Sequence, residues 1–295
     1  MVIKMGILAT IKKFFSKKAE KSPVESIEQP VLKVEGIKTN PSELMEAVYI
    51  GDPEGLKALI AKGADINVQN EYGNTALMYA VKKGRSKMVS CLIEAGADVN
   101  LQNNQGLTAL TFAAMRGNNL SINKLIEAGA KVDVQDCSGR TALMYASTNG
   151  YTDSVNSLIR ANSDLEIKNE NGYTALISAA RNGHHETVQA LLNAGANIDA
   201  QNNNGYTALM SAAREGHRET VKVLLCSGAN IDIKNQKGHT ALFFANVNHN
   251  SDCAELINAC TEPSITFRPR PPQRISRHSN TSLGRTRFKE QYQKS

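Results

Sequence analysis

The chain has 295 residues, a formal net charge of +6 and 41% hydrophobic residues, but only 5% aromatic residues and no Trp. It contains no run of about 18 apolar residues, so the sequence predicts no membrane-spanning helix. Its five cysteines lack C-x-x-C spacing, which favours reduced thiols in a cytoplasmic protein and argues against a zinc site.

The charge is unevenly distributed along the chain. Residues 1–39 carry eight Lys and four Glu, a net charge of +4, and residues 263–295 carry eight Lys or Arg and one Glu, a net charge of +7. This leaves residues 40–262 with a net charge of about −5. The basic character therefore belongs to the two ends, and the middle of the chain is mildly acidic.

Residues 1–18 form an amphipathic pattern when they are placed on a helix. One side carries Ile7, Leu8, Ile11, Phe14 and Phe15, and the other carries Lys12, Lys13 and Lys17. Two interpretations stay open: an interfacial helix attracted to anionic lipid, or a segment that docks on the next domain or stays unfolded. The apolar stretch is too short for a secretory signal peptide, and residues 21–39 are expected to form a linker.

The most regular feature is a Gly-x-Thr-Ala-Leu motif that returns every 33 residues, beginning at Gly73, Gly106, Gly139, Gly172, Gly205 and Gly238. A Gly-Ala pair keeps the same period, beginning at Gly63, Gly96, Gly129, Gly195 and Gly228, and Asn162-Ser163 fills the missing position. A fixed period of this length predicts stacked structural units that bury their apolar faces against one another.

Each unit is expected to contain two short amphipathic helices and a loop. In the unit that begins at Gly73, the helices are indicated by Leu77, Ala80 and Val81 and then by Val89, Leu92 and Ile93. Gly96, or Asn162 in its place, is expected to end the second helix in a left-handed conformation. The stretch that follows is rich in Asn, Gln and Asp and ends in Gly, as a β-turn or hairpin does.

Helix, turn, helix and hairpin at a period of 33 residues resemble the ankyrin repeat, over about residues 40–262. The resemblance implies an all-α ankyrin-repeat solenoid of about seven helix-turn-helix units with short β-hairpin loops, flanked by flexible basic tails. The units are expected at residues 40–72, 73–105, 106–138, 139–171, 172–204, 205–237 and 238–262. They would lie between the basic segment at residues 1–39 and a disordered Pro/Arg/Ser tail at residues 263–295.

The sequence departs from the family pattern at two positions. The usual Thr-Pro-Leu-His reads Thr75-Ala76-Leu77-Met78, which removes one hydrogen bond expected from the family. The family's turn Asp is kept only at Asp136, and the other units carry Asn there.

The first and last units are degenerate, as terminal units with one face in water are expected to be. Asn40, Pro41 and Glu43 suit the start of a helix. The last unit has His249 in place of the turn Gly, and Pro263 follows it.

No catalytic, cofactor or metal site is predicted. None of the six His residues pairs with Cys or carboxylates at a metal-ligand spacing, and the sequence contains no nucleophile elbow or phosphate-binding loop. His184 and His217 share one position after the turn Gly, where the ankyrin resemblance implies a structural role. The sequence therefore predicts a protein that is not an enzyme, with no cofactor and no small-molecule substrate.

In the family that the sequence resembles, the partner usually lies against a concave face built from hairpin tips and first helices. These positions are rich in Tyr and Arg, which are enriched at interface hot spots, and they give the candidate protein-binding residues Leu107, Met115, Arg116, Arg140, Tyr173, Arg181, Tyr206 and Arg214. The units at Gly172 and Gly205 are close copies. The leading hypothesis is a monomeric cytoplasmic scaffold or adaptor that binds a protein with an acidic or mixed surface. The alternative is that these side chains are merely solvated and bind no partner.

Two other functions stay open. The basic termini could bind nucleic acid or an anionic membrane, with the solenoid as a spacer, and Arg-x-x-Pro patterns in the tail suit proline-motif docking. The 28 Asn residues, with many Lys and Ile, make the chain similar to ankyrin-repeat proteins of intracellular bacteria, some of which are delivered into host cells. A secreted effector that acts on host proteins, with an export signal in its C-terminal tail, is therefore a further hypothesis.

Overall fold

The computed structural model describes residues 41–260. The chain divides into two units, Met1–Ile37 and Lys38–Ser295, and the described residues all belong to the second. The amphipathic helix expected at residues 1–18, the linker and the tail at residues 263–295 lie outside the described residues and stay predictions.

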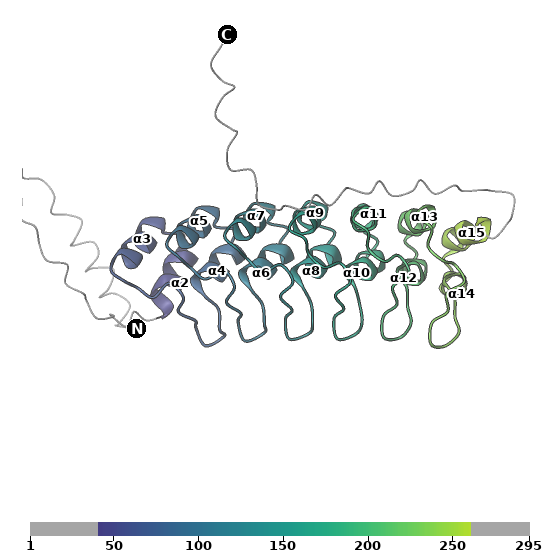
Figure 1. Ribbon diagram of the computed structural model, residues 1–295, viewed down its shortest axis with the longest axis horizontal. Helices are drawn as coiled ribbons and strands as arrows, with labels where there is room; N and C mark the ends of the chain where they lie inside the picture. Colours follow the sequence, from purple (N-terminus) through teal and green to yellow (C-terminus); the bar gives the residue numbers. More distant parts are fainter. Residues whose placement is uncertain (1–40, 261–295) are drawn as a thin grey trace, which may run out of the picture. The chain divides into compact units, whose positions relative to one another are not determined.

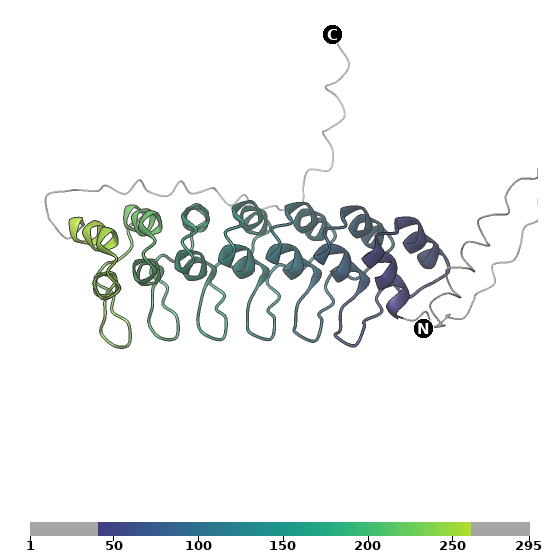
Figure 2. The same ribbon diagram turned by 180° about the vertical axis from the view of Figure 1, so that it is seen from behind.

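The described residues form fourteen helices that lie in two layers (Figures 1 and 2). The first helices of the units are α2 (Pro41–Ile50), α4 (Ala76–Lys82), α6 (Ala109–Met115), α8 (Ala142–Thr148), α10 (Ala175–Arg181), α12 (Ala208–Glu215) and α14 (Ala241–Val247). The second helices are α3 (Pro53–Ala61), α5 (Ser86–Glu94), α7 (Asn119–Glu127), α9 (Thr152–Arg160), α11 (His185–Asn193), α13 (Arg218–Cys226) and α15 (Ser251–Ala259). Neighbours in each layer contact one another, and each first helix packs on the second helix of its own unit. The seven helix pairs confirm the predicted all-α solenoid.

A threonine side chain starts the first helix of each unit from Gly73 onward. Thr75 Oγ1 accepts a hydrogen bond from the Met78 N–H at 3.3 Å. The threonines at the same position in the following units cap their helices in the same way, namely Thr108, Thr141, Thr174, Thr207 and Thr240. Such a cap contributes about 1 kcal/mol. These helices are far shorter than the roughly 12 residues that an isolated helix needs, so packing between units must stabilise them.

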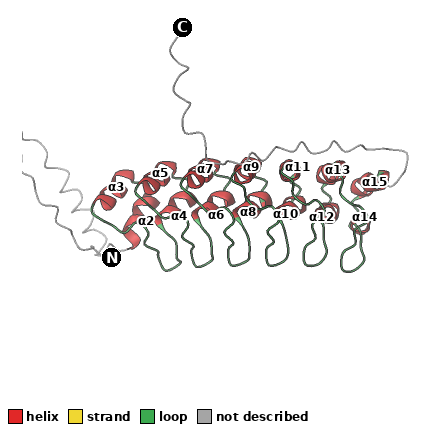
Figure 3. Ribbon diagram, in the orientation of Figure 1, coloured by secondary structure: helices red, strands yellow, loops and turns green. Residues whose placement is uncertain are grey.

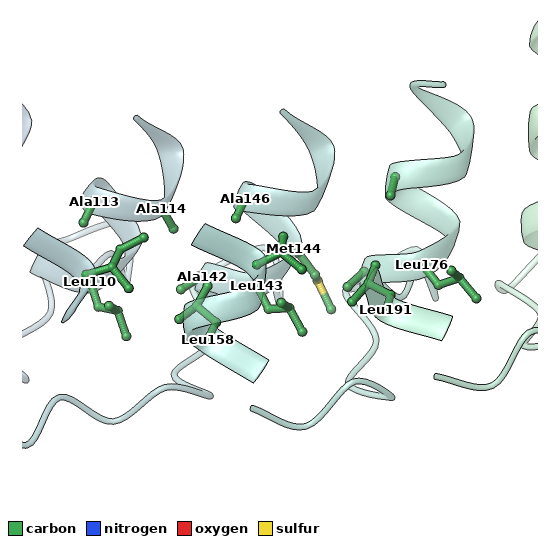
Figure 4. Packing of buried hydrophobic residues seen from close by; sticks show 14 of the residues in the cluster. Leu110, Ala113, Ala114, Ala142, Leu143, Met144, Ala146, Leu158, Leu176 and Leu191 are labelled. Atoms are coloured by element: carbon green, nitrogen blue, oxygen red, sulfur yellow. The ribbon is translucent and has the colours of Figure 1, made fainter. Parts of the chain in front are cut away.

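Leucines at matching positions of successive units form the centre of the core. Leu110 and Leu143 of the first helices are each 1% exposed, and Leu158 of α9 is fully buried (Figure 4). One continuous hydrophobic cluster extends from Leu44 to Ile257. Because each layer touches only its neighbours, the array buries its apolar surface unit by unit.

Two non-glycine residues of residues 41–260 have a positive φ. Asn162 has φ 62° in the position where Gly96 has φ 87°, which confirms the predicted left-handed end of the second helix. His249 has φ 59° in the turn of the last unit. The same turn position is crowded in the middle of the array, where a Cβ added to Gly150 would lie 2.5 Å from the His184 ring of the next unit. No described unit follows α15, so no such residue covers His249.

Side-chain hydrogen bonds close the loops between units. Asn169 Oδ1 accepts from the backbone N–H groups of Asn171 at 3.0 Å and Tyr173 at 2.9 Å. The residue at the same position does this in every loop, namely Asn70, Asn103, Asp136, Asn202 and Asn235. Asn therefore replaces the family's Asp without loss of this acceptor. The hairpin loops contain no assigned β-strand within residues 41–260 (Figure 3).

A ladder of glutamines ties neighbouring loops together. Gln102 Nε2 donates to Gly106 O of its own loop at 2.8 Å and to Gln135 O of the next loop at 3.2 Å. Gln69, Gln135 and Gln201 make the same pair of bonds. The loop tips therefore keep a fixed spacing, and side chains on them are presented by a rigid framework.

Candidate functional site

A pocket of about 120 Å³ lies over α10, α12 and the loops that precede them. Seven residues line it, Tyr173, Arg181, Asn204, Tyr206, Ser211, Arg214 and Glu215, and we call it the Tyr-Arg pocket. It belongs to the surface made by the first helices and the loops, the first-helix face. Four of the eight residues proposed from the sequence as partner contacts, Tyr173, Arg181, Tyr206 and Arg214, are thus brought together in one hollow.

The two units build the pocket from the same parts. Each tyrosine follows the first Gly of its unit, and its backbone N–H is held by Asn169 or Asn202 at 2.9 Å. Arg181 lies in the last turn of α10, where its Nη1 donates to Tyr173 Oη at 3.4 Å and its Cζ lies 5.7 Å from the centroid of the Tyr173 ring. The aromatic ring thus holds the cation at the mouth of the pocket.

Both guanidinium groups retain capacity for a ligand. No carboxylate among residues 41–260 lies within ion-pair distance of Arg181. Arg214 Nε lies 4.0 Å from Glu215 Oε1, and the two side chains are 51% and 40% exposed. An exposed pair at this distance contributes little to stability. Most of the N–H donors of the two arginines therefore remain available.

The duplicated units carry a small residue where the other units from Gly73 onward carry a ring. At this position of the first helix, the other units from Gly73 onward have Tyr79, Phe112, Tyr145 and Phe244, and the duplicated units have Ser178 and Ser211. The Ser211 hydroxyl donates to Thr207 O at 2.9 Å and stays close to its own helix. The aromatic ring comes from the loop instead, as Tyr173 and Tyr206.

Asn202 lies in the loop before α12 and is only 5% exposed. Its Oδ1 accepts from the N–H groups of Asn204 at 3.0 Å and Tyr206 at 2.9 Å. Its Nδ2 has no hydrogen-bond partner among the residues that the structure describes. In the unit at Gly73 the equivalent atom, Asn70 Nδ2, donates to the Tyr79 hydroxyl at 3.3 Å. The shorter side chain in α12 leaves the Asn202 donor unpaired.

Arg140 lies one unit before the pocket and is exposed. Its Cζ lies 5.6 Å from the centroid of the Tyr145 ring, and the Tyr145 hydroxyl donates to Asp136 Oδ2 at 2.6 Å. Burial and then the hydrogen bond to Asp136 raise the pKa of Tyr145 to about 12, although the nearby Arg140 charge opposes the rise. Arg140 therefore extends the row of cations on the first-helix face.

The remaining predicted contact residues come from the unit at Gly106. Arg116 is exposed and Met115 is half-buried at the end of α6, so both offer surface to a partner. Leu107 is only 6% exposed. The prediction that Leu107 contacts a partner is corrected, because its apolar side chain turns into the protein, whereas the tyrosines at the same position remain partly accessible.

A second hollow of about 340 Å³ lies near the start of the array. It is lined by Tyr72, Asn74, Tyr79, Lys82, Asn103, Asn104 and Gln105. Amide and hydroxyl groups dominate this lining, with one cation. The sequence did not identify it. Sequence reasoning also missed Asn204 and Ser211 in the Tyr-Arg pocket and the buried Asn202 in the same loop as Asn204. Ser211 could have been found from the sequence, because it replaces the aromatic residue that most other units carry on the first helix, while the loop before it gains Tyr206.

The histidines that follow the turn glycines join units together. The Nε2 atoms of His184 and His217 lie 3.0 Å from Thr148 O and Arg181 O of the preceding units. The structural role expected for this position is therefore confirmed, and His217 also braces the end of α10 below the pocket. Residues 41–260 contain no group of three or more His, Cys, Asp or Glu that could hold a metal ion. None of the helices described there is long and apolar enough to cross a membrane.

The model of the family described as "Ankyrin repeats (3 copies)" matches the chain in overlapping segments, residues 44–136, 88–169, 112–202, 143–235 and 199–266. The chain belongs to the ankyrin repeat family. Ankyrin repeat domains generally mediate protein–protein interaction and are typically non-catalytic binding scaffolds.

Among solved structures, the crystal structure of the human ASB11 ankyrin repeat domain is similar to this ankyrin domain. The identity is 28%, the TM-score is 0.67, and the match covers 75% of this chain and 99% of that chain. No curated protein matches the chain.

Proposed function

We propose that this ankyrin domain is a scaffold or adaptor that binds a protein partner through the first-helix face, with the Tyr-Arg pocket at the centre of the contact. The single observation that supports the proposal is the gathering of Tyr173, Arg181, Tyr206 and Arg214 around one hollow. Tyr and Arg carry much of the binding energy at interfaces because each combines a large area with polar groups.

The charge of this face favours an acidic or mixed partner surface. The ends of the first helices carry Lys82, Lys83, Arg116, Arg181 and Arg214, and Glu215 is the one acidic residue at these positions in α4 to α12. By contrast, residues 40–262 as a whole carry a net charge of about −5. Cations are thus concentrated where the partner is expected, which steers association and disfavours basic partners.

The test is affinity capture with mass spectrometry on the full chain. The variant replaces Arg140, Tyr173, Arg181, Tyr206 and Arg214 by Ala, and far-UV circular dichroism verifies its fold. The control variant replaces Arg218 and Lys222 of α13 by Ala, because both lie beside Glu219, at 2.7 Å and 4.0 Å, and neither lines the pocket. A partner kept by the control variant and lost by the five-residue variant is the expected result. Retention of every captured protein by both variants contradicts the proposal.

Binding by the termini is the second candidate, and the net charges of +4 and +7 on residues 1–39 and 263–295 favour it. It predicts that the chain captures nucleic acid or anionic vesicles and that the affinity falls steeply as salt is raised from about 50 to 500 mM. The affinity should fall by orders of magnitude when several phosphates are contacted. Such capture should survive the five-residue change. Delivery into a host cell and a monomeric, cytoplasmic state stay predictions from the sequence.

A further inference from the structure

We propose that the Tyr-Arg pocket binds one carboxylate side chain, an Asp or Glu, of the partner protein. This rests on the proposed function, because it names the group that the first-helix face recognises. The pocket offers guanidinium donors from Arg181 and Arg214 and hydroxyl groups from Tyr173 and Tyr206. Arginine forks match the two oxygens of a carboxylate, and such charge-assisted bonds are stronger than neutral ones.

Asn202, in the loop that carries Asn204 and Tyr206, has a buried donor without a partner. Its amide orientation is fixed, because Oδ1 already accepts two backbone N–H groups and Nδ2 must point the other way. The equivalent second atoms of Asn70 and Asp136 meet the hydroxyls of Tyr79 and Tyr145. In α12 that helix position is Ser211, which lines the pocket.

Asn202 itself is buried and does not line the pocket, but its Oδ1 holds the N–H groups of Asn204 and Tyr206, which do. Its Nδ2–H stays unpaired, and the Ser211 hydroxyl lies against its own helix, where it donates to Thr207 O at 2.9 Å. A buried donor without a partner is costly, so the lining next to it is incompletely satisfied. A carboxylate oxygen is an acceptor only, so it suits the arginine donors.

Charge selects a carboxylate among anions. The hollow of about 120 Å³ has room for a carboxylate group. Glu215 lines the same pocket and lies 4.0 Å from Arg214. Its negative charge repels a dianionic phosphate more strongly than a singly charged carboxylate. Glu215 also competes for Arg214, so its removal should strengthen the binding.

The test is an NMR titration of the isotope-labelled full chain with two peptides, acetyl-Gly-Ser-Glu-Ser-Gly-amide and its Gln counterpart. The Glu peptide is expected to shift the side-chain signals of Asn202, Arg181 and Arg214 saturably, and the Gln peptide is not. We expect Arg214→Gln to weaken Glu-peptide binding about tenfold and Glu215→Gln to strengthen it. Arg218→Gln is the matched control, because it removes the same charge at an exposed site that lies outside the pocket.

A second variant changes the lining of the pocket without removing its cations. Tyr206→Asn combined with Ser211→Tyr recreates the Asn74 and Tyr79 pair of the unit at Gly73, and it should give Asn202 Nδ2 a hydroxyl partner. We expect loss of the Glu-specific shifts with an unchanged circular dichroism spectrum. Equal binding of both peptides, or full binding by this variant, overturns the carboxylate assignment.

The titration and the capture experiment can fail separately. If the five-residue variant loses its partner but the Glu peptide causes no specific shift, the first-helix face binds a protein and the carboxylate assignment is wrong. If the Glu peptide binds specifically and no partner is lost, the pocket recognises carboxylates and the proposed function is wrong.

Discussion

Gly150 and Gly84 occupy the same turn position in two units and allow the contact between units to be measured. Their φ angles are 70° and 67°. A Cβ at Gly150 would lie 2.5 Å from Nδ1 and 2.7 Å from Cγ of His184, whereas a Cβ at Gly84 would meet nothing within 4 Å. Replacement of each glycine by Ala therefore imposes the same backbone strain, but only Gly150→Ala forces the next unit to move.

The two costs can be estimated separately. An alanine in the left-handed region loses about 1–2 kcal/mol, which applies to both variants. At residue 150 the whole His184 ring must shift, because the near atoms lie at its base. Its contact of 3.0 Å between Nε2 and Thr148 O is then lost, at about 1 kcal/mol, and repacking adds about 1 kcal/mol or more. We expect Gly84→Ala to lower the free energy of unfolding by about 1–2 kcal/mol and Gly150→Ala by about 3–4 kcal/mol.

The measurement combines urea denaturation, followed by far-UV circular dichroism, with native-state hydrogen exchange, because a repeat array need not unfold in one step. Slow exchange should be lost first around α8 and α11 in Gly150→Ala. His184→Ala should cost less in the Gly150→Ala background than in the native chain, as expected for residues in contact. Free energies for the two glycine variants within about 0.5 kcal/mol of each other would show that His184 does not hold the units together in this way.

Three further predictions concern single side chains. Asn162→Gly should raise the free energy of unfolding by about 0.5–1 kcal/mol and Asn162→Ala should lower it by about 1 kcal/mol in urea denaturation, because φ is 62° there. The pKa of Tyr145 rises from 10 to about 12 on folding, so the folded state holds this proton more tightly than the unfolded state does. The Tyr145 contribution to the free energy of unfolding is therefore constant below pH 10 and falls from pH 10 to 12. Tyr145→Phe should make this fall smaller in denaturation curves recorded at about pH 9 and 11. Burial, with repulsion from Asp164, raises the pKa of Asp133. Asp133→Asn removes the charge but should keep the hydrogen bond from the Asp164 N–H. We expect a higher melting temperature at pH 7, with a free energy of unfolding raised by about 0.5 kcal/mol or less because solvent screens this site.

The repeat architecture was readable from the sequence because its determinants are local and periodic. Thr75, Leu77 and Leu92 each serve one purpose, capping or burial, and each returns every 33 residues. Asn162 was readable for the same reason, since a left-handed helix end accepts few residues other than Gly and Asn. Signals repeated in six units reinforce one another, so a degenerate first unit did not obscure the pattern.

The shape of the binding surface was only partly readable. Position in the repeat identified Tyr173 and Arg181, but it did not distinguish them from Leu107, which turns inward. Whether a side chain at a loop tip faces solvent depends on the residue opposite it on the first helix. The unpaired amide of Asn202 also depends on Ser211, nine residues further along the chain, so single positions read in isolation do not show it.

In two units the aromatic residue of the first helix is replaced by Ser and the loop carries a Tyr instead, which gives this part of a uniform array a distinct surface. The units at Gly172 and Gly205 keep the Thr cap, the buried leucines and the closed loops, so their fold is the same as that of the other units. Moving the ring from the helix to the loop leaves Ser178 and Ser211 on the helices and brings Tyr173 and Tyr206 beside Arg181 and Arg214. Because duplication repeats the change in adjacent units, the two arginines share one hollow. A single unit with this change would supply one cation, and the pair of units supplies the two that a carboxylate can bridge.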